Sequence, residues 1–363
     1  MAKKSIILIA AVTLIVTALG IFSNTGKKLL GSPLAQFWSW NQKTAKDNCQ
    51  LKPKPREFSH QPYYTGQLID AHIHMPVSSS IVSAVGKRIG FKNMLAFGGT
   101  LTLDYLACLF KSEGISQTIG FFMTTRFSTW QELTAVKKAT KNYPGRIAPF
   151  FMPAPYSILR VKPSDVRNTL DKNKGLFKGI GEIKVFDGTS LDNPYFMEMF
   201  KIASDYNLII MMHPFQDHRP TVEKILKQHP KVKFLLHGGK DAEWIMEVMK
   251  DYKNLYYSLD ADIVSLYGWE RGHARKEPTK EEWLNYIRKN FDSVLNEQLR
   301  DWKPKIEAYS DRFMWGTDRW YAWHFDYEVG GLLEEYGRTF IGKLAPSVRE
   351  KFAYKNAERL LKQ

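Results

Sequence analysis

Cysteine is nearly absent from this chain of 363 residues, which has only Cys49 and Cys108. No CxxC pair occurs, so neither cysteine is expected to be a nucleophile or a zinc ligand. Cys49 lies in an apparent linker and Cys108 in the helical pattern LDYLACLF. We therefore expect no disulfide framework.

Glycine-rich phosphate loops are also missing. Neither GxGxxG nor GxxxxGK[ST] follows an early strand pattern, which disfavours a nucleotide-binding fold. The chain has no long low-complexity tract, and 44% of its residues are hydrophobic. This composition is sufficient for a sizeable core and argues against disorder.

Acidic residues are outnumbered, and the formal net charge is +15. Residues 1–60 hold nine Lys and Arg against two acids, while the remaining residues hold 43 against 35. Nearly half of the excess thus lies near the N-terminus, where it can set membrane topology or attract anionic lipid. Nucleic acid is not an expected partner, because net charge alone does not indicate a basic groove.

The N-terminal segment has the pattern of a membrane anchor or a secretory signal. Lys3 and Lys4 precede an apolar run at 6–22, which as a helix would span about 26 Å, close to the thickness of a bilayer core. The preferred hypothesis is a single anchor. The alternative is a signal cleaved after the small residues around 18–20 and a secreted product. Both hypotheses place the rest of the chain on the periplasmic or extracellular side.

The chain divides into three parts on this pattern. Residues 1–26 are the anchor or signal, 27–60 are a linker and 61–363 are one folded domain. The linker contains the run KPKPR at 52–56, whose prolines exclude a regular helix.

From Gln67 onward, short apolar runs alternate with helical patterns, as a parallel sheet with crossover helices requires. Helical patterns lie near 99–113, 129–144 and 279–299, the last with a Thr279–Glu282 capping box. The expected strands are 67–75, 116–125, 146–155, 177–185, 207–215, 232–239, 254–262 and 312–320. Eight such units predict a (β/α)8 TIM barrel with its site at the carboxyl ends of the strands. A doubly wound open sheet is the alternative.

Metal-binding side chains end several of these strands. His72 and His74 alternate along the first strand and so share one face. The other candidates at strand ends are Glu182 and Lys184 on the fourth strand, His213 on the fifth, His237 on the sixth and Asp318 on the eighth. Each residue alone is weak evidence, but their joint position predicts a divalent-metal site, since imidazole and carboxylate groups bind zinc and similar ions.

The motifs IDAHIHM, GIGEIKV, MMHPF, LLHGG and WGTDRW, spread over about residues 67–363, resemble the amidohydrolase superfamily and its amidohydrolase-related (amidohydrolase-2) branch. The resemblance implies that His72, His74, His213 and Asp318 bind metal. In single-metal relatives the histidine matching His237 transfers protons. In two-metal relatives a glutamate matching Glu182 bridges the ions, the His237 equivalent binds the second, and Asp318 serves as general base.

The choice between one ion and two stays open, with a slight preference for the Glu182-bridged pair. A carboxylated Lys184 is the least favoured arrangement, and Lys184 is instead a candidate for binding an anionic substrate group. Basic residues in loops after the strands are further candidates for this role: Arg126, His218 and Arg319.

The expected function is that of a metal-dependent hydrolase, and zinc is the expected ion. A metal-bound hydroxide would cleave a C–O or C–N bond of a small substrate, which could be anionic. Asp318 and His237 are the expected catalytic residues. The alternatives are a metal-dependent decarboxylase, a TatD-like phosphodiesterase and a non-catalytic, membrane-tethered binding barrel. Assembly into a homo-oligomer is left open.

Overall fold

The computed structural model describes residues 49–76, 101–185, 188–238, 244–260 and 278–362. Within these ranges, eight parallel strands form one sheet in which each strand pairs with its neighbour in chain order. The strands are β1 (Leu68–His74), β2 (Ile115–Thr124), β3 (Ile147–Pro153), β4 (Gly179–Ile183), β5 (Ile209–Met212), β6 (Phe234–Leu236), β7 (Leu255–Leu259) and β8 (Phe313–Trp315).

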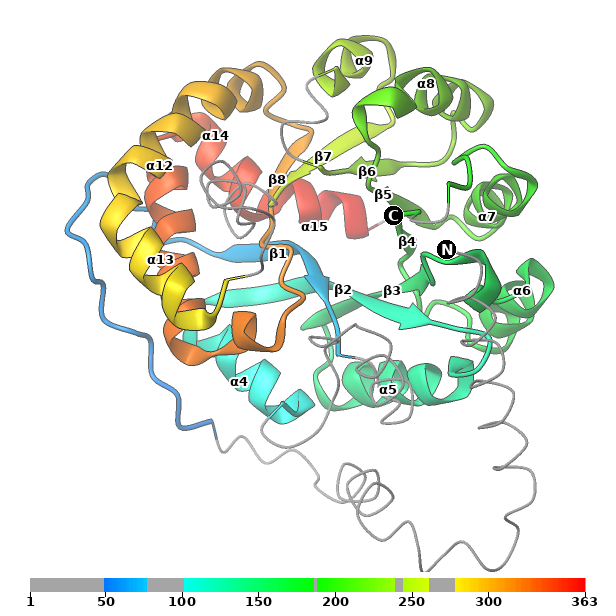
Figure 1. Ribbon diagram of the computed structural model, residues 1–363, viewed down its shortest axis with the longest axis horizontal. Coiled ribbons are helices and arrows are strands. Elements are labelled where there is room, and N and C mark those ends of the chain that lie inside the picture. Colours follow the sequence, from blue (N-terminus) through cyan, green and yellow to red (C-terminus); the bar gives the residue numbers. More distant parts are fainter. Residues whose placement is uncertain (1–48, 77–100, 186–187, 239–243, 261–277, 363) are drawn as a thin grey trace, which may run out of the picture.

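The sheet curls into a nearly closed barrel, because its first and last strands meet at their carboxyl ends (Figure 1). His74 N donates to Arg319 O at 2.9 Å, and Asp318 N donates to His72 O at 2.8 Å. Seven strands lie inside the ranges expected from the sequence, β2 begins one residue earlier at Ile115, and the strand order confirms the predicted barrel.

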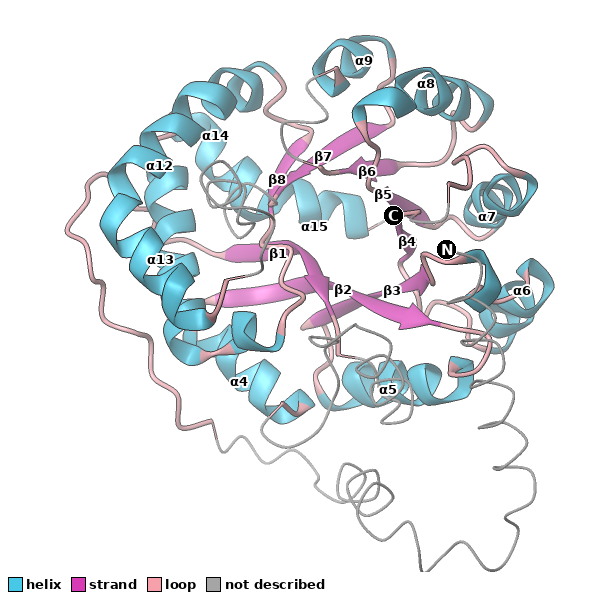
Figure 2. Ribbon diagram, viewed as in Figure 1, coloured by secondary structure: helices cyan, strands magenta, loops and turns pink. Residues whose placement is uncertain are grey.

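Helices surround the barrel on its outer side (Figure 2). The principal ones are α4 (Leu103–Ser112), α5 (Thr129–Asn142), α6 (Pro163–Lys172), α7 (Pro194–Asp205), α8 (Arg219–Gln228), α9 (Ile245–Asp251), α12 (Lys280–Ala308) and α13 (Tyr327–Gly342). The chain also forms the short elements η2 (Ser157–Leu159), η3 (Gln216–His218), η5 (Ala322–Phe325), α14 (Pro346–Glu350), η6 (Lys351–Lys355) and α15 (Asn356–Leu361).

The helix α12 begins at the predicted capping box. Thr279 Oγ1 accepts a hydrogen bond from Glu282 N at 3.2 Å, and Glu282 Oε2 accepts one from Thr279 N at 2.8 Å. The helix continues past the predicted end at residue 299 to Ala308, with Pro304 inside it. Packing of Trp302 and Ile306 into the core accounts for this extension, since a buried apolar face offsets the loss caused by one proline.

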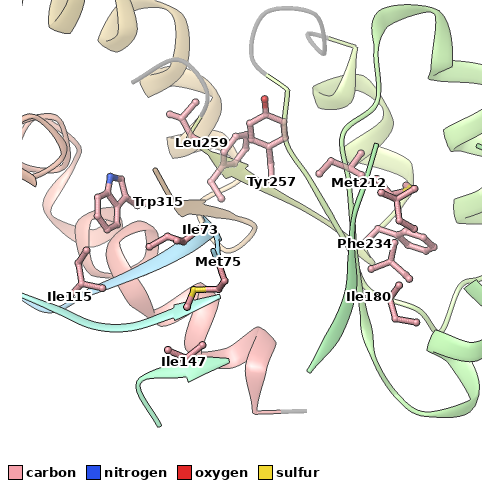
Figure 3. Packing of buried hydrophobic residues seen from close by; sticks show 14 of the residues in the cluster. Ile73, Met75, Ile115, Ile147, Ile180, Met212, Phe234, Tyr257, Leu259 and Trp315 are labelled. Atoms are coloured by element: carbon pink, nitrogen blue, oxygen red, sulfur yellow. The ribbon is translucent and has the colours of Figure 1, made fainter. Parts of the chain in front are cut away.

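Alternation along the strands separates two apolar layers. Ile210 and Met212 of β5 and Phe234 of β6 join the cluster between the strands and the helices, part of which Figure 3 shows. Met211 and Leu235, with the opposite parity, join the inner cluster of the barrel. Because the period is two, the next inward positions after them are His213 and His237.

Residues 49–66 form a strap that lies against the outer helices rather than apart from the barrel. The Glu335 carboxylate on α13 accepts hydrogen bonds from Glu57 N at 2.7 Å and Phe58 N at 2.8 Å. The Phe58 ring stacks on Phe291 of α12, with 4.1 Å between the ring centroids.

A disulfide joins Cys49 of the strap to Cys108 of α4. This finding corrects the expectation that the two cysteines would not pair. They are 59 residues apart in sequence, but the strap brings their Cα atoms to 5.1 Å, within the range of a disulfide.

No helix in the described ranges is both long enough and apolar enough to cross a bilayer. The apolar run at 6–22, on which the anchor hypothesis depends, lies outside the described residues.

Candidate metal centre

The first strand supplies two histidines, and the loop after β8 supplies a carboxylate beside them. The three distances among His72 Nε2, His74 Nε2 and Asp318 Oδ1 are 3.2, 3.3 and 3.1 Å. Four ligands placed tetrahedrally at about 2.1 Å from a zinc ion stand about 3.4 Å apart. These three atoms are therefore spaced as ligands of one small divalent ion.

A second group of three ligand atoms comes from the ends of β4, β5 and β6. Glu182 Oε1 lies 3.0 Å from His213 Nδ1 and 2.6 Å from His237 Nε2, and the two ring nitrogens are 3.1 Å apart. The other oxygen of the same carboxylate, Glu182 Oε2, lies 3.4 Å from His74 Nε2. One carboxylate thus faces both groups, as a residue bridging two ions would.

The structure brings together all six residues predicted as metal ligands. Their donor set of imidazole nitrogens and carboxylate oxygens is the one that zinc and related ions take. Overlapping subsets of these residues have ligand atoms within 4.8 Å of one another, as a metal site requires.

Asp260, at the end of β7, belongs to this site and was not among the predicted residues. Its Oδ2 lies 2.8 Å from His72 Nδ1, and its Oδ1 lies 3.2 Å from His237 Nδ1. A carboxylate that accepts from both Nδ1 atoms leaves both Nε2 atoms free to face the metal. The sequence could have indicated Asp260, because it ends the seventh strand in the pattern NLYYSLDAD, as the predicted ligand residues end their own strands.

Burial and neighbouring charges together set the protonation of the residues in this cluster. Burial favours the neutral form of His237, but Asp260 and Glu182 raise its pKa to about 10. Burial, with His237 and Lys184 nearby, lowers the pKa of His213 to about 4. Burial likewise opposes charge on Glu182, yet Lys184 and His237 hold its pKa well below the usual value. His213 is therefore a neutral imidazole and Glu182 a carboxylate, the forms that bind metal.

The backbone after β8 is shaped to deliver Asp318. Asp318 has a φ of 48°, in the left-handed region that aspartate tolerates better than most residues. Gly316 lies where a Cβ atom would come within 2.7 Å of Ser258 Oγ and 3.3 Å of His72 Cβ. A residue without a side chain thus lets the strand pass close to the cluster.

Of the residues predicted to bind substrate, Lys184 lies at the cluster. Its Nζ is 3.3 Å from His213 Nδ1. Arg126 is exposed in the loop after β2, with its guanidinium 4.9 Å from the Phe127 ring centroid. His218, on η3 after β5, accepts a hydrogen bond from Phe215 N at its Nδ1.

Arg319 occupies a different environment from the one expected. Its side chain is fully buried, and both terminal nitrogens bind the Glu113 carboxylate, at 3.0 and 2.8 Å. A guanidinium held in this ion pair cannot turn toward a substrate without leaving Glu113 as an unpaired buried charge. Its position indicates that Arg319 joins the β8 loop to the end of α4, and does not support the predicted substrate-binding role.

The solved structures that share this fold include two amidohydrolase-type proteins. An amidohydrolase from Burkholderia multivorans with bound zinc is 15% identical, with a TM-score of 0.55 over 82% of this chain and 99% of that one. A probable 2-pyrone-4,6-dicarboxylic acid hydrolase from Acinetobacter baumannii with bound citric acid is 10% identical, with a TM-score of 0.52 over 82% and 100%. None of the curated proteins matches this sequence.

At such identities the structural likeness shows the fold alone. The Amidohydrolase family model, by contrast, matches residues 69–363, which contain every candidate ligand described above. This chain therefore belongs to the amidohydrolase family, as its motifs had indicated.

Proposed function

We propose that this protein is a metal-dependent hydrolase that cleaves a C–O or C–N bond of a small substrate. The observation that carries the proposal is the placement of Glu182, whose two oxygens face two separate groups of ligand atoms. An arrangement of this kind suits two ions bridged by one carboxylate. Zinc is the ion that we propose, since the donors suit it and it is bound in the B. multivorans structure.

When bound, such ions lower the pKa of water and polarise the bond to be broken. The chain's own residues would then handle the proton. Burial disfavours charge on Asp318, but His72 and His74 lower the pKa of Asp318 below its usual value. Asp318 is therefore ionised at neutral pH, and it would accept a proton from water and pass it to the leaving atom.

Lys184 would contribute to the choice of substrate. Its ammonium group lies beside His213, at the edge of the ligand cluster. A positive charge at this position favours substrates with a carboxylate or another anionic group near the scissile bond. The citric acid bound in the A. baumannii structure has groups of this kind.

The first test is the metal content of the full-length chain. We expect close to two zinc ions per chain in the wild type. In Glu182→Gln we expect about one ion or fewer, because an amide is a much poorer bridging ligand than a carboxylate. Glu198→Gln, on the outer helix α7, is the matched control and should keep both ions. A wild-type chain that takes up no metal after reconstitution would contradict the proposal.

Activity assays then separate the reaction classes. Hydrolysis of a lactone or amide panel, lost on chelation and restored by zinc, would support the proposal. Release of carbon dioxide by a chain holding a single ion would instead identify a decarboxylase, with His237 as the proton-transfer residue. Cleavage of bis(4-nitrophenyl) phosphate would identify a phosphodiesterase.

We also propose that the barrel lies outside the cytoplasm, tethered by the N-terminal segment. The Cys49–Cys108 disulfide supports this location, because such bonds persist in oxidising compartments. Thiol-reactive polyethylene glycol, present as the alkylating agent when the cells are lysed, should leave both cysteines unmodified unless a reductant is added first. Cysteines that are reactive without reductant would argue for a cytoplasmic barrel.

A further inference from the structure

His324 lies on η5, in the same loop after β8 that carries Asp318. Its side chain is buried, with an exposed fraction of 2%. Its Nδ1 accepts hydrogen bonds from two backbone amides, Trp320 N at 3.1 Å and Tyr321 N at 3.4 Å. A nitrogen that accepts from amides carries no proton, so the hydrogen of the neutral ring is on Nε2.

The ring is both neutral and fixed in orientation. Burial lowers the pKa of His324 to about 3, while the charge of Asp318 acts in the opposite direction and that of His74 in the same one. The peptide unit between Arg319 and Trp320 joins the ring to the centre, since its oxygen accepts from His74 N at 2.9 Å and its N–H donates to His324 Nδ1. Trp323 and Tyr321 pack edge-on against it, with ring centroids at 4.2 and 5.0 Å.

The Nε2 atom has no hydrogen-bond partner among the described residues. A buried donor without a partner costs about 1–3 kcal/mol, so such groups are uncommon in native structures. Trp315 Nε1 also lacks a partner among the described residues, but it packs in the apolar cluster between the strands and the helices. His324 differs from Trp315 because it lies in the loop that carries Asp318 and binds the peptide that also accepts from His74 N.

We propose that His324 is a substrate-binding residue whose Nε2–H donates a hydrogen bond to a carboxylate oxygen of the substrate. This inference rests on the proposed function, since it assigns the substrate of the same site to the carboxylic acids. The charge of Lys184, beside His213 in the same ligand cluster, favours an anionic substrate, and a hydrogen bond to a charged acceptor is stronger than one to a neutral group.

The tautomer defines what His324 does. Its Nδ1 is occupied by backbone amides and its Nε2 already carries the proton, so the ring does not act as a general base. It is a donor held in place before the substrate arrives. A substrate without an acceptor at this point leaves the donor unpaired, which is the basis of strong discrimination between otherwise similar ligands.

Two substitutions separate the donor from the structural role of the ring. In His324→Asn, the side-chain oxygen can take the place of Nδ1 and keep the backbone hydrogen bonds, but the Nε2–H donor is lost. In His324→Gln, the longer side chain can place an N–H near the position of Nε2. Thermal unfolding and zinc content of both variants, compared with the wild type, report whether the loop and the centre are intact.

The probe is malonate, a small dicarboxylate, added to full-length protein with histidines labelled with 15N. We expect the wild-type His324 spectrum to show a neutral ring protonated at Nε2, and its Nε2 signal to shift on malonate binding. The dissociation constant should rise about tenfold in His324→Asn, the loss expected for one charge-assisted hydrogen bond, and less than threefold in His324→Gln.

The proposal is overturned if malonate does not bind the wild type, if the Nε2 signal stays unchanged at saturation, or if His324→Asn binds malonate as tightly as the wild type. If His324→Asn does not fold, the wild-type spectrum and the malonate affinity of His324→Gln still test whether His324 donates a hydrogen bond to the ligand. A chain without metal or hydrolytic activity refutes the proposed function, whereas a metal-loaded, active chain with unchanged malonate affinity in His324→Asn refutes only the role of His324.

Discussion

At the scale of single residues, one carboxylate orients two histidines of the centre. Asp260 is fully buried between His72 on β1 and His237 on β6, and it contacts the Nδ1 atom of each. Burial opposes its charge, yet His237 and His72 lower its pKa far below the usual value. Asp260 is therefore a carboxylate throughout the physiological pH range. A bound metal ion would take the Nε2 atom of each ring and displace the proton that the raised pKa of His237 otherwise keeps there.

Substitution Asp260→Asn should weaken zinc binding about 10–100-fold, since an amide cannot accept from both Nδ1 atoms and carries no charge. Competition with a fluorescent zinc chelator measures this affinity. Asp251→Asn, at the exposed end of α9, is the matched control and should bind zinc as the wild type does. An unchanged affinity in Asp260→Asn would show that the histidines are oriented by other contacts.

At the scale of elements, β7 and β8 pass close enough for Gly316 to matter. A Cβ atom at this position would meet Ser258 Oγ at 2.7 Å and Asp260 Cβ at 3.2 Å. We expect Gly316→Ala to lower the free energy of unfolding by about 1–3 kcal/mol, as overpacking of a core does. Adding Ser258→Ala removes the nearest atom and should restore most of the loss. Denaturant unfolding of the two single variants and the double variant tests this coupling, and strictly additive effects would contradict it.

At the scale of the whole molecule, the strap and its disulfide hold the segment before β1 against the outer helices. The bond closes a loop of 59 residues, and a loop of this size should stabilise the chain by about 2–4 kcal/mol. The strap touches α4, α12 and α13 on the outside of the barrel, away from the metal centre.

Reduction of the disulfide should therefore lower the melting temperature by several degrees and leave zinc content and turnover unchanged. Differential scanning fluorimetry with and without reductant measures the shift. The Cys49→Ser/Cys108→Ser variant should melt at the temperature of the reduced chain, and its melting temperature should not change when reductant is added. A reduced chain that melts like the oxidised one would mean that the contacts of Phe58 and Glu335 suffice to hold the strap.

Anchoring to a membrane and assembly into oligomers stay predictions.

The sequence by itself determined the barrel and the convergence of its candidate metal ligands. Strand periodicity is a local property, and parallel strands place their carboxyl ends at one mouth, so His72, His74, Glu182, His213, His237 and Asp318 had to converge once the sheet closed. The family motifs carry the same information, because they lie at those strand ends.

Only the tertiary structure decided which distant groups pair. Arg319 meets Glu113 across 206 residues, and Cys49 meets Cys108 across 59. Asp260 contacts two rings on different strands, and the backbone of one loop sets the tautomer of His324. Such pairings depend on how loops and helices pack around the barrel, and no local periodicity records them, because residues far apart in sequence come into contact only when the chain is folded.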